Sequence, residues 1–257
     1  MEASFWDGKR APGIADTVDV SQYDSVVEVI EQAFKKYADR PAFTSIGLTM
    51  TYKQIDEYSA AFASYLQNHT NLKPGDTIAI QMPNTLQYPI AMYAALRCGY
   101  RVTNVNPLYT EREMEHQFND SGAKALVCME MFARSVQNVV GNTGIETVIV
   151  TSLADMLPTV KRTLINFAVK HVKKMVPAYS LPSAISFRKA LKLGAKKGFE
   201  ANHIRGPHDT IILQYTGGTT GVAKGAELTN RNIVANMLQS KNALGQIGDD
   251  GLPLKGE

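Results

Sequence analysis

Short apolar segments alternate with amphipathic segments between residues 77 and 150, and this alternation limits the fold more than any other feature. The predicted strands are Ile78–Ile80, Val102–Val105, Ala125–Cys128 and Thr147–Val150, and the predicted helices are Pro89–Arg97, Glu111–Asp120 and Met131–Val140. Apolar strands separated by helices are typical of right-handed crossovers and of a mostly parallel sheet that is covered on both faces. We therefore predict an α/β fold with helices on both faces of a mostly parallel sheet.

Local signals set the ends of several predicted helices. Thr110 and Glu113 have the spacing of a capping box, in which two orphan backbone amides are satisfied reciprocally. Gly99 and Gly122 follow predicted helix ends, where a left-handed backbone conformation is common. These signals support the predicted order of strands and helices.

The segment before residue 77 has a different pattern. Residues 1–24 form an arm without strong periodicity, and a helix is predicted from Val26 to Tyr37. A short strand pair follows at 41–43 and 50–52. A second helix is then predicted to bury the face formed by Ile55, Tyr58, Ala61, Phe62 and Tyr65.

The segment from Met156 to Phe199 carries ten of the 27 Lys and Arg residues and no Asp or Glu. Apolar residues at Val160, Leu164, Phe167, Ala168, His171, Val172 and Met175 share one helical face, and basic residues occupy the other face. Two interpretations stay open. The segment is either a surface insertion with a solvated positive face, or a patch at residues 160–197 that rests on anionic lipid.

Charge, cysteine content and hydropathy exclude several classes of protein. The formal net charge of +3 is too small to predict a nucleic-acid partner. Two cysteines, Cys98 and Cys128, make neither a disulfide framework nor a metal site, so we expect small core residues in a reducing, cytoplasmic compartment. The polar start of the chain argues against an export signal, and the charge-free run from Ile78 to Leu96 is too polar for a membrane span.

A glycine- and threonine-rich segment follows the predicted strand Asp209–Tyr215. Residues 216–224 read Thr-Gly-Gly-Thr-Thr-Gly-Val-Ala-Lys. Glycines allow the backbone to approach a ligand and expose its amides, hydroxyls add donors or a metal ligand, and Lys224 adds a point charge. The segment therefore predicts a polyphosphate-binding loop, anchored by a helix at about Asn232–Leu238. It is neither a Walker A loop nor a dinucleotide fingerprint.

These residues carry a resemblance to a known family. The run Tyr215–Gly225 with Thr229–Asn232 resembles the phosphate loop of the adenylate-forming superfamily, and most of all that of bacterial long-chain fatty acyl-CoA synthetases. Gly217 and Ala223 stand where the wider superfamily usually has Ser and Pro, as is typical of the fatty acyl-CoA branch. Further matching segments are Met50–Tyr52, Leu72–Asp76, Met82–Asn84, Asn104–Thr110 and Ala184–Arg188.

The resemblance implies a two-step ligase that uses a fatty acid, ATP, Mg²⁺ and coenzyme A. It places the nucleotide phosphates against Tyr215, Thr216, Gly217, Gly218, Thr219, Thr220, Gly221, Val222, Ala223 and Lys224. The catalytic residues that it implies are Lys224, which stabilises the leaving pyrophosphate, and Thr219, which ligates Mg²⁺. His116 is predicted to be a surface or capping histidine rather than a general base.

The resemblance also predicts the organisation of the chain. We expect an N-terminal fragment of the large AMP-binding domain, without the small C-terminal domain and with little activity alone. Its parts are an arm (1–24), an α/β subdomain (25–155), a basic amphipathic insertion (156–199), and a strand, phosphate loop and following helix (200–257). A cytoplasmic protein, peripheral on the inner face of the cell membrane and homodimeric when complete, is compatible with this expectation.

Two alternatives to fatty acid activation stay open. One is adenylation of another carboxylic acid, such as an aryl or amino acid, which would share the loop. The other is a non-catalytic fragment that docks on a membrane or a partner through its basic segment. No nucleic-acid partner is expected.

Overall fold

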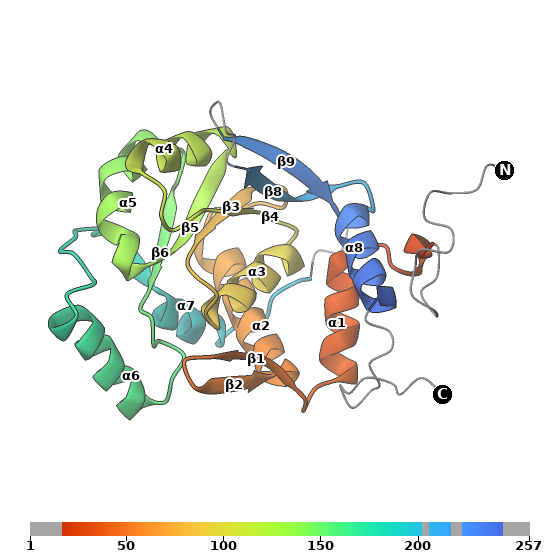
Figure 1. The fold of residues 1–257 in the computed structure, drawn as a ribbon, viewed down its shortest axis with the longest axis horizontal. Coiled ribbons are helices and arrows are strands. Elements are labelled where there is room, and N and C mark those ends of the chain that lie inside the picture. Colours follow the sequence, from red (N-terminus) through yellow and green to blue (C-terminus); the bar gives the residue numbers. More distant parts are fainter. Residues whose placement is uncertain (1–16, 202–205, 217–222, 244–257) are drawn as a thin grey trace.

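The computed structural model describes residues 17–201, 206–216 and 223–243. Its main sheet has seven strands in the order β7-β6-β5-β3-β4-β8-β9 (Figure 1). All neighbouring strands are parallel except β8 and β9, which are antiparallel. The mostly parallel α/β sheet expected from the sequence is thus confirmed.

The bounds of the strands are β1 (Pro41–Ser45), β2 (Leu48–Thr51), β3 (Thr77–Gln81), β4 (Arg101–Asn104), β5 (Ala123–Met129), β6 (Thr147–Thr151), β7 (Ile185–Ser186), β8 (Thr210–Thr216) and β9 (Lys224–Thr229). Those of the helices are α1 (Val26–Lys36), α2 (Tyr52–His69), α3 (Gln87–Arg97), α4 (Glu111–Asp120), α5 (Ala133–Val139), α6 (Thr159–Phe167), α7 (Phe187–Gly194) and α8 (Asn230–Ala243). Strands β1 and β2 form a separate antiparallel pair.

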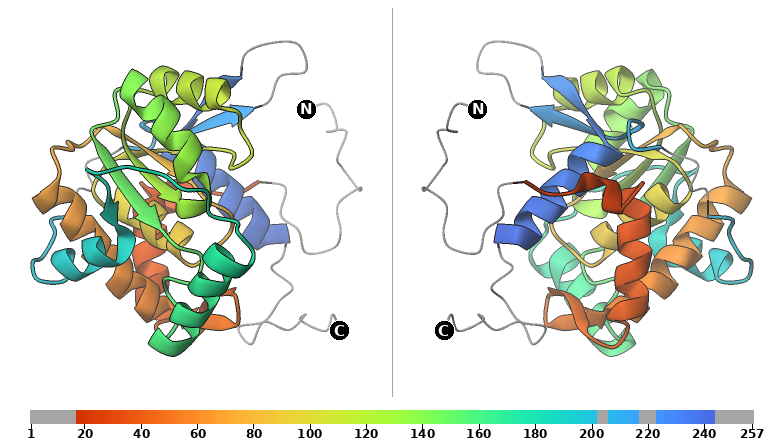
Figure 2. Two further views of the ribbon diagram at one scale, coloured as in Figure 1. Left: turned by 90° about the vertical axis from the view of Figure 1, so that its left-hand side faces the viewer. Right: turned by 90° about the vertical axis from the view of Figure 1, so that its right-hand side faces the viewer.

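Helices cover the main sheet on both faces, as Figures 1 and 2 show. One apolar cluster joins alternate strand residues, among them Ile78 and Ile80, to α1, α2, α3 and α7. The second cluster joins the intervening residues, among them Ala79, to Met114 and Phe118 of α4 and to α5. This division follows the two-residue alternation of side chains along a strand.

The local end signals act as predicted. The Thr110 backbone amide donates to Glu113 Oε2 at 2.8 Å, and the Glu113 amide donates to Thr110 Oγ1 at 3.4 Å, which completes the capping box. Gly99 and Gly122 have φ angles of +74° and +62°, a region that glycine enters without steric cost.

Three expectations need correction. Tyr58 does not lie on the buried face of α2: it is 37% exposed, and Ser59 is fully buried in its place. The predicted helix at 131–140 is divided into a 3₁₀ turn, α5 and a second 3₁₀ turn. The helix predicted from the apolar face Val160–Met175 is α-helical only as far as Phe167, where α6 ends, and a π-helical turn, Ala168–Val172, follows it.

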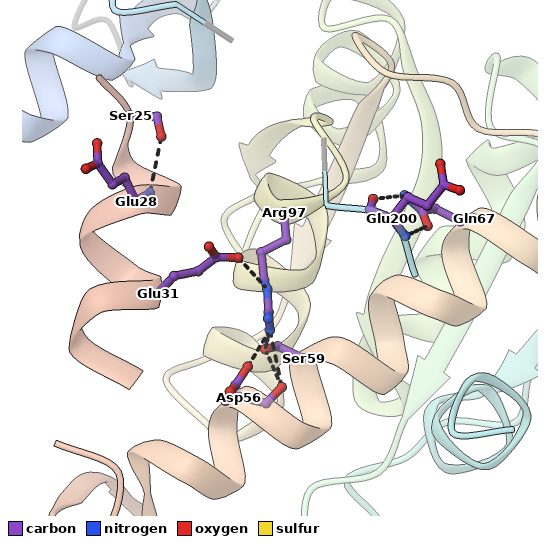
Figure 3. A network of polar contacts seen from close by, with 8 residues as sticks. All are labelled: Ser25, Glu28, Glu31, Asp56, Ser59, Gln67, Arg97 and Glu200. Atoms are coloured by element: carbon purple, nitrogen blue, oxygen red, sulfur yellow. Dashed lines mark hydrogen bonds and ion pairs between the residues drawn. The ribbon is translucent and has the colours of Figure 1, made fainter. Parts of the chain in front are cut away.

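Ser59 is buried because it binds Arg97, which joins three helices (Figure 3). Arg97 Nη1 donates to Ser59 Oγ at 2.9 Å and lies 2.8 Å from Asp56 Oδ1 on α2. Arg97 Nε lies 3.6 Å from Glu31 Oε1 on α1. The guanidinium also stacks on the ring of Phe199, with 4.8 Å between its carbon and the ring centroid. A buried cation is thereby paired on several sides, as burial of a charge requires.

No helix in the part of the chain that the structure describes is long and apolar enough to cross a bilayer. Cys98 and Cys128 are both fully buried and carry free thiols, as predicted.

Gly194 allows the close contact of α7 with α2. A Cβ added at Gly194 would lie 1.8 Å from the Ala61 carbonyl oxygen, and a backbone atom cannot move aside as a flexible side chain can. We expect Gly194→Ala to lower the free energy of unfolding in urea by about 3 kcal/mol. Gly198→Ala is the control, since a Cβ there meets no atom within 4 Å. Equal effects of the two variants would contradict this account of the contact.

The buried cysteines make a second prediction. Burial raises the pKa of both the Cys98 and the Cys128 thiol to about 12. Since the thiolate is the nucleophile, iodoacetamide at pH 8.5 should modify neither residue in the folded chain and both in urea. Rapid modification of the folded chain by iodoacetamide, detected by mass spectrometry, would contradict this prediction.

Because folding raises the pKa values of both thiols, the free energy of unfolding should also fall as the pH rises above about 9.

Candidate functional site

The carboxyl ends of β3, β4 and β8 lie at one edge of the sheet, because these three strands are parallel. After β3 the chain enters α3 on one face, and after β4 it enters α4 on the other. Ligands of open α/β sheets bind in the crevice outside such strand ends, where successive connections leave in opposite directions. This edge is therefore the candidate site.

Polar side chains gather at this edge. The Tyr88 hydroxyl donates to Asn104 Oδ1 at 3.0 Å, and Asn104 Nδ2 donates to Gln214 Oε1 at 3.5 Å. Gln117 Nε2 donates to Thr103 Oγ1 at 2.8 Å and to the Asn104 carbonyl at 2.9 Å. Burial raises the pKa of Tyr88, and the hydrogen bond to Asn104 partly offsets this rise. Hydrogen bonds thus connect α3, α4 and the ends of β4 and β8.

The predicted phosphate loop connects the two strands of a hairpin. Thr216 at the end of β8 pairs with Lys224 at the start of β9, and Tyr215 pairs with Gly225. Six predicted loop residues lie outside the described part of the chain: Gly217, Gly218, Thr219, Thr220, Gly221 and Val222. The sequence predicted only a helix after the loop; the structure adds β9 between the loop and α8.

Lys224 and Thr216 are both exposed at this edge. Directly opposed residues of antiparallel strands present their side chains on the same face. The hairpin therefore places Lys224 and Thr216 on the same face of the sheet, just beyond the end of β4. An anionic group bound here would meet one cation and one hydroxyl donor.

Tyr215 is buried, and its hydroxyl is bound to α4. The hydroxyl donates to Asp120 Oδ2 at 2.5 Å. Burial and the Asp120 carboxylate raise the pKa of Tyr215 well above its usual value. A Cβ at Gly225 would lie 2.9 Å from the Tyr215 ring, so the glycine leaves room for this ring to cross β9. The Tyr215 side chain thus faces α4, and its backbone remains next to the predicted loop.

His116, predicted to be a surface or capping histidine, also contacts the hairpin. His116 Nε2 lies 3.0 Å from the Ala223 carbonyl oxygen, in hydrogen-bond geometry. His116 and Asp120 are one helical turn apart, so they share a face of α4. That spacing was visible in the sequence, but nothing in it named the hairpin as the partner.

Residues 17–201, 206–216 and 223–243 contain no group of three or more His, Cys, Asp or Glu side chains that could hold a metal ion. The described part of the site therefore does not form a protein metal cage.

Comparisons with known proteins identify the family of the chain. A family model described as "AMP-binding enzyme" matches residues 30–252. The long-chain-fatty-acid–CoA ligase of Escherichia coli O157:H7 is 47% identical over 249 residues, which cover 97% of this chain and 44% of that protein. The chain thus spans less than half the length of this curated relative.

Solved structures show the same fold. A long-chain-fatty-acid–CoA ligase from Archaeoglobus fulgidus superposes with a TM-score of 0.65 at 27% identity, over 86% of this chain and 40% of that one. An anthranilate CoA ligase, solved with anthranoyl-AMP, gives a TM-score of 0.67 at 17% identity, over 83% of this chain and 37% of that one. The family model covers most of the chain, and the fold is shared with these ligases: the chain belongs to the AMP-binding enzyme family.

Proposed function

We propose that this chain supplies the nucleotide-phosphate site of an ATP-dependent long-chain fatty acid–CoA ligase. The observation that carries the proposal is the β8–β9 hairpin, which sets Lys224 and Thr216 side by side at the carboxyl edge of the parallel sheet. The 47% identity to a long-chain-fatty-acid–CoA ligase supports the fatty acid as substrate.

The proposed reaction has two steps. A fatty acid carboxylate oxygen attacks the α-phosphorus of ATP, the bond from this phosphorus to the bridging oxygen breaks, and an acyl-adenylate and pyrophosphate form. The thiol sulfur of coenzyme A then attacks the acyl carbonyl carbon, the carbon–oxygen bond to AMP breaks, and the thiol proton is released. The products are an acyl-CoA thioester and AMP.

In this proposal the loop binds and orients the phosphates. Lys224 stabilises the charge that develops on the departing pyrophosphate, which is the kind of interaction that lowers a barrier most. The backbone amides of residues 216–223 would add donors, and the Thr219 hydroxyl would be one ligand of the nucleotide-bound Mg²⁺. When bound, Mg²⁺ neutralises phosphate charge.

Adenylation of an aryl or amino acid is the competing proposal, since the anthranilate CoA ligase has the same fold. Gly217 and Ala223 favour the fatty acid branch, because the wider superfamily usually has Ser and Pro at these positions. Carboxylate-dependent ATP–pyrophosphate exchange separates the two proposals. It should be measured on the natural full-length chain that contains this sequence, with acetate, long fatty acids, benzoates and amino acids. Exchange that is fastest with long fatty acids supports the proposal, and exchange that is fastest with another class overturns it.

Lys224→Ala in that full-length chain should slow pyrophosphate exchange by about 10²-fold, because a positioned cation is lost from the leaving group. The free energy of unfolding should change little, since the side chain is exposed. Lys241→Ala, which removes an exposed cation from the last turn of α8, is the matched control. An unchanged exchange rate in Lys224→Ala would contradict the assigned role.

We further propose that the basic segment binds the anionic surface of the cell membrane. The apolar side chains of α6 and the residues after it point to solvent: Val160, Leu164, Phe167, Val172 and Met175 are 72%, 65%, 59%, 67% and 48% exposed. Arg188, Lys189 and Lys192 of α7 line a cavity of about 580 Å³ together with Tyr58 and with Met156, which shortly precedes α6 in the chain. Apolar side chains flanked by cations suit insertion between anionic headgroups.

Vesicle binding tests this second proposal. The chain should co-sediment with phosphatidylglycerol vesicles at low salt and be released at high salt. Leu164→Ser with Phe167→Ser should weaken binding about 10-fold or more, because two apolar side chains no longer leave water. Leu108→Ser is the control, since Leu108 is 86% exposed but lies outside the segment. Absence of binding at low salt, or equal losses in both variants, would overturn the membrane proposal.

A further inference from the structure

Helix α4 contacts the hairpin at both ends of the loop that the proposed function assigns to phosphate binding. We propose that His116 and Asp120 are positioning residues, which hold these two ends and thereby fix Lys224 for the adenylation step. The inference rests on the proposed function of the loop, and its contacts are all among described residues.

The His116 contact acts on the peptide unit next to Lys224. The Ala223 carbonyl, which lies 3.0 Å from His116 Nε2, belongs to the same planar peptide as the Lys224 amide. A hydrogen bond to this carbonyl therefore limits rotation of the peptide that introduces Lys224. Lys224 then starts β9 and pairs with Thr216.

The Asp120 contact acts on the other end of the loop. Tyr215 directly precedes Thr216, and its hydroxyl donates to Asp120 Oδ2 at 2.5 Å. Hydrogen bonds to an ionised carboxylate are short and strong, and Tyr215 is only 8% exposed. The ring reaches Asp120 across Gly225, where a side chain would collide with it.

Helix α4 is itself firmly held, so these contacts can transmit a fixed position. Its capping box is complete, and Met114, Gln117 and Phe118 are 1%, 0% and 0% exposed. Gln117 also binds Thr103 and the Asn104 carbonyl of β4. The helix thus connects the hairpin to the strand ends that form the rest of the site.

Positioning and simple structural support predict different kinetics. A misplacement of about 1 Å at a reacting centre can cost on the order of 10²-fold in rate, whereas lost packing lowers stability without altering the folded enzyme. His116→Phe keeps the ring volume and removes the hydrogen bond. His116→Gln keeps an amide donor near the position of Nε2. Glu115→Gln on the same helix is the control, because Glu115 accepts from Asn142 and has no described bond to the hairpin.

The experiment measures the KM for ATP and the kcat of fatty-acid-dependent pyrophosphate exchange on the natural full-length chain, at temperatures where every variant is folded. We expect His116→Phe to lower kcat/KM for ATP about 10-fold or more, and His116→Gln to recover most of this loss. Glu115→Gln should match the wild type. An unchanged kcat/KM in His116→Phe, or equal defects in the Phe and Gln variants, overturns the inference.

Hydrogen exchange separates failure of the inference from failure of the proposed function. If the wild-type chain shows no fatty-acid-dependent ATP–pyrophosphate exchange, the proposed function fails. The backbone amides of residues 213–216 and 224–227 then decide the positioning claim. They should exchange faster in His116→Phe than in the wild type or Glu115→Gln. Equal exchange rates in all three overturn the claim that His116 holds the hairpin.

The two contacts should also be coupled. Tyr215→Phe removes the hydroxyl that binds Asp120 and keeps the ring over Gly225. Because both contacts restrain the same loop, the kcat/KM losses of Tyr215→Phe and His116→Phe should combine non-additively in the double variant. Strictly additive losses would contradict action through one shared element.

Discussion

Strand β3 is paired on both sides, and this pairing sets the positions of the helices and of the candidate site. All five residues of β3 are buried, so its backbone amides and carbonyls have no access to water and must be paired within the sheet. Parallel pairing with β4 on one side and β5 on the other satisfies them. Parallel neighbours need crossover connections, and these bring α3 and α4 to opposite faces. The crevice at the strand ends is a consequence of that division.

Helix α4 makes contacts with the core on one face and with the hairpin on another. Met114 and Phe118 pack in the apolar cluster that α4 and α5 form with one face of the sheet, while His116 and Asp120 are hydrogen-bonded to the β8–β9 hairpin. The hairpin carries Lys224 on β9, which is the outermost strand of the sheet among the described residues. Because α4 packs in the core and is hydrogen-bonded to the hairpin, it gives the hairpin a defined position.

The basic segment contrasts with this core. Its helical periodicity resembles that of α1, yet α1 buries Val26, Val27, Ile30 and Phe34, whereas α6 buries none of its residues. Amphipathic periodicity indicates that one face of a helix prefers an apolar environment, but not which environment supplies it. For α1 that environment is the sheet, and for α6 we propose a lipid surface.

Features that depend on near neighbours in the chain could be predicted from the amino-acid sequence alone. Strand and helix order between residues 77 and 151, the capping box at Thr110 and the left-handed glycines follow from periodicity and local backbone sterics. The glycine–threonine segment likewise predicts a phosphate loop through its own composition, and this loop stays a proposal. The partners of Tyr215 and His116 depend on the three-dimensional arrangement instead, because these bonds join residues 95 and 107 positions apart. The exchange of Tyr58 for Ser59 on the buried face of α2 has the same origin: Arg97, 38 residues beyond Ser59, supplies a buried partner for its hydroxyl. Local patterns fix which face of an element is apolar, whereas contacts between distant residues depend on how the crossovers stack, which no short stretch of sequence encodes.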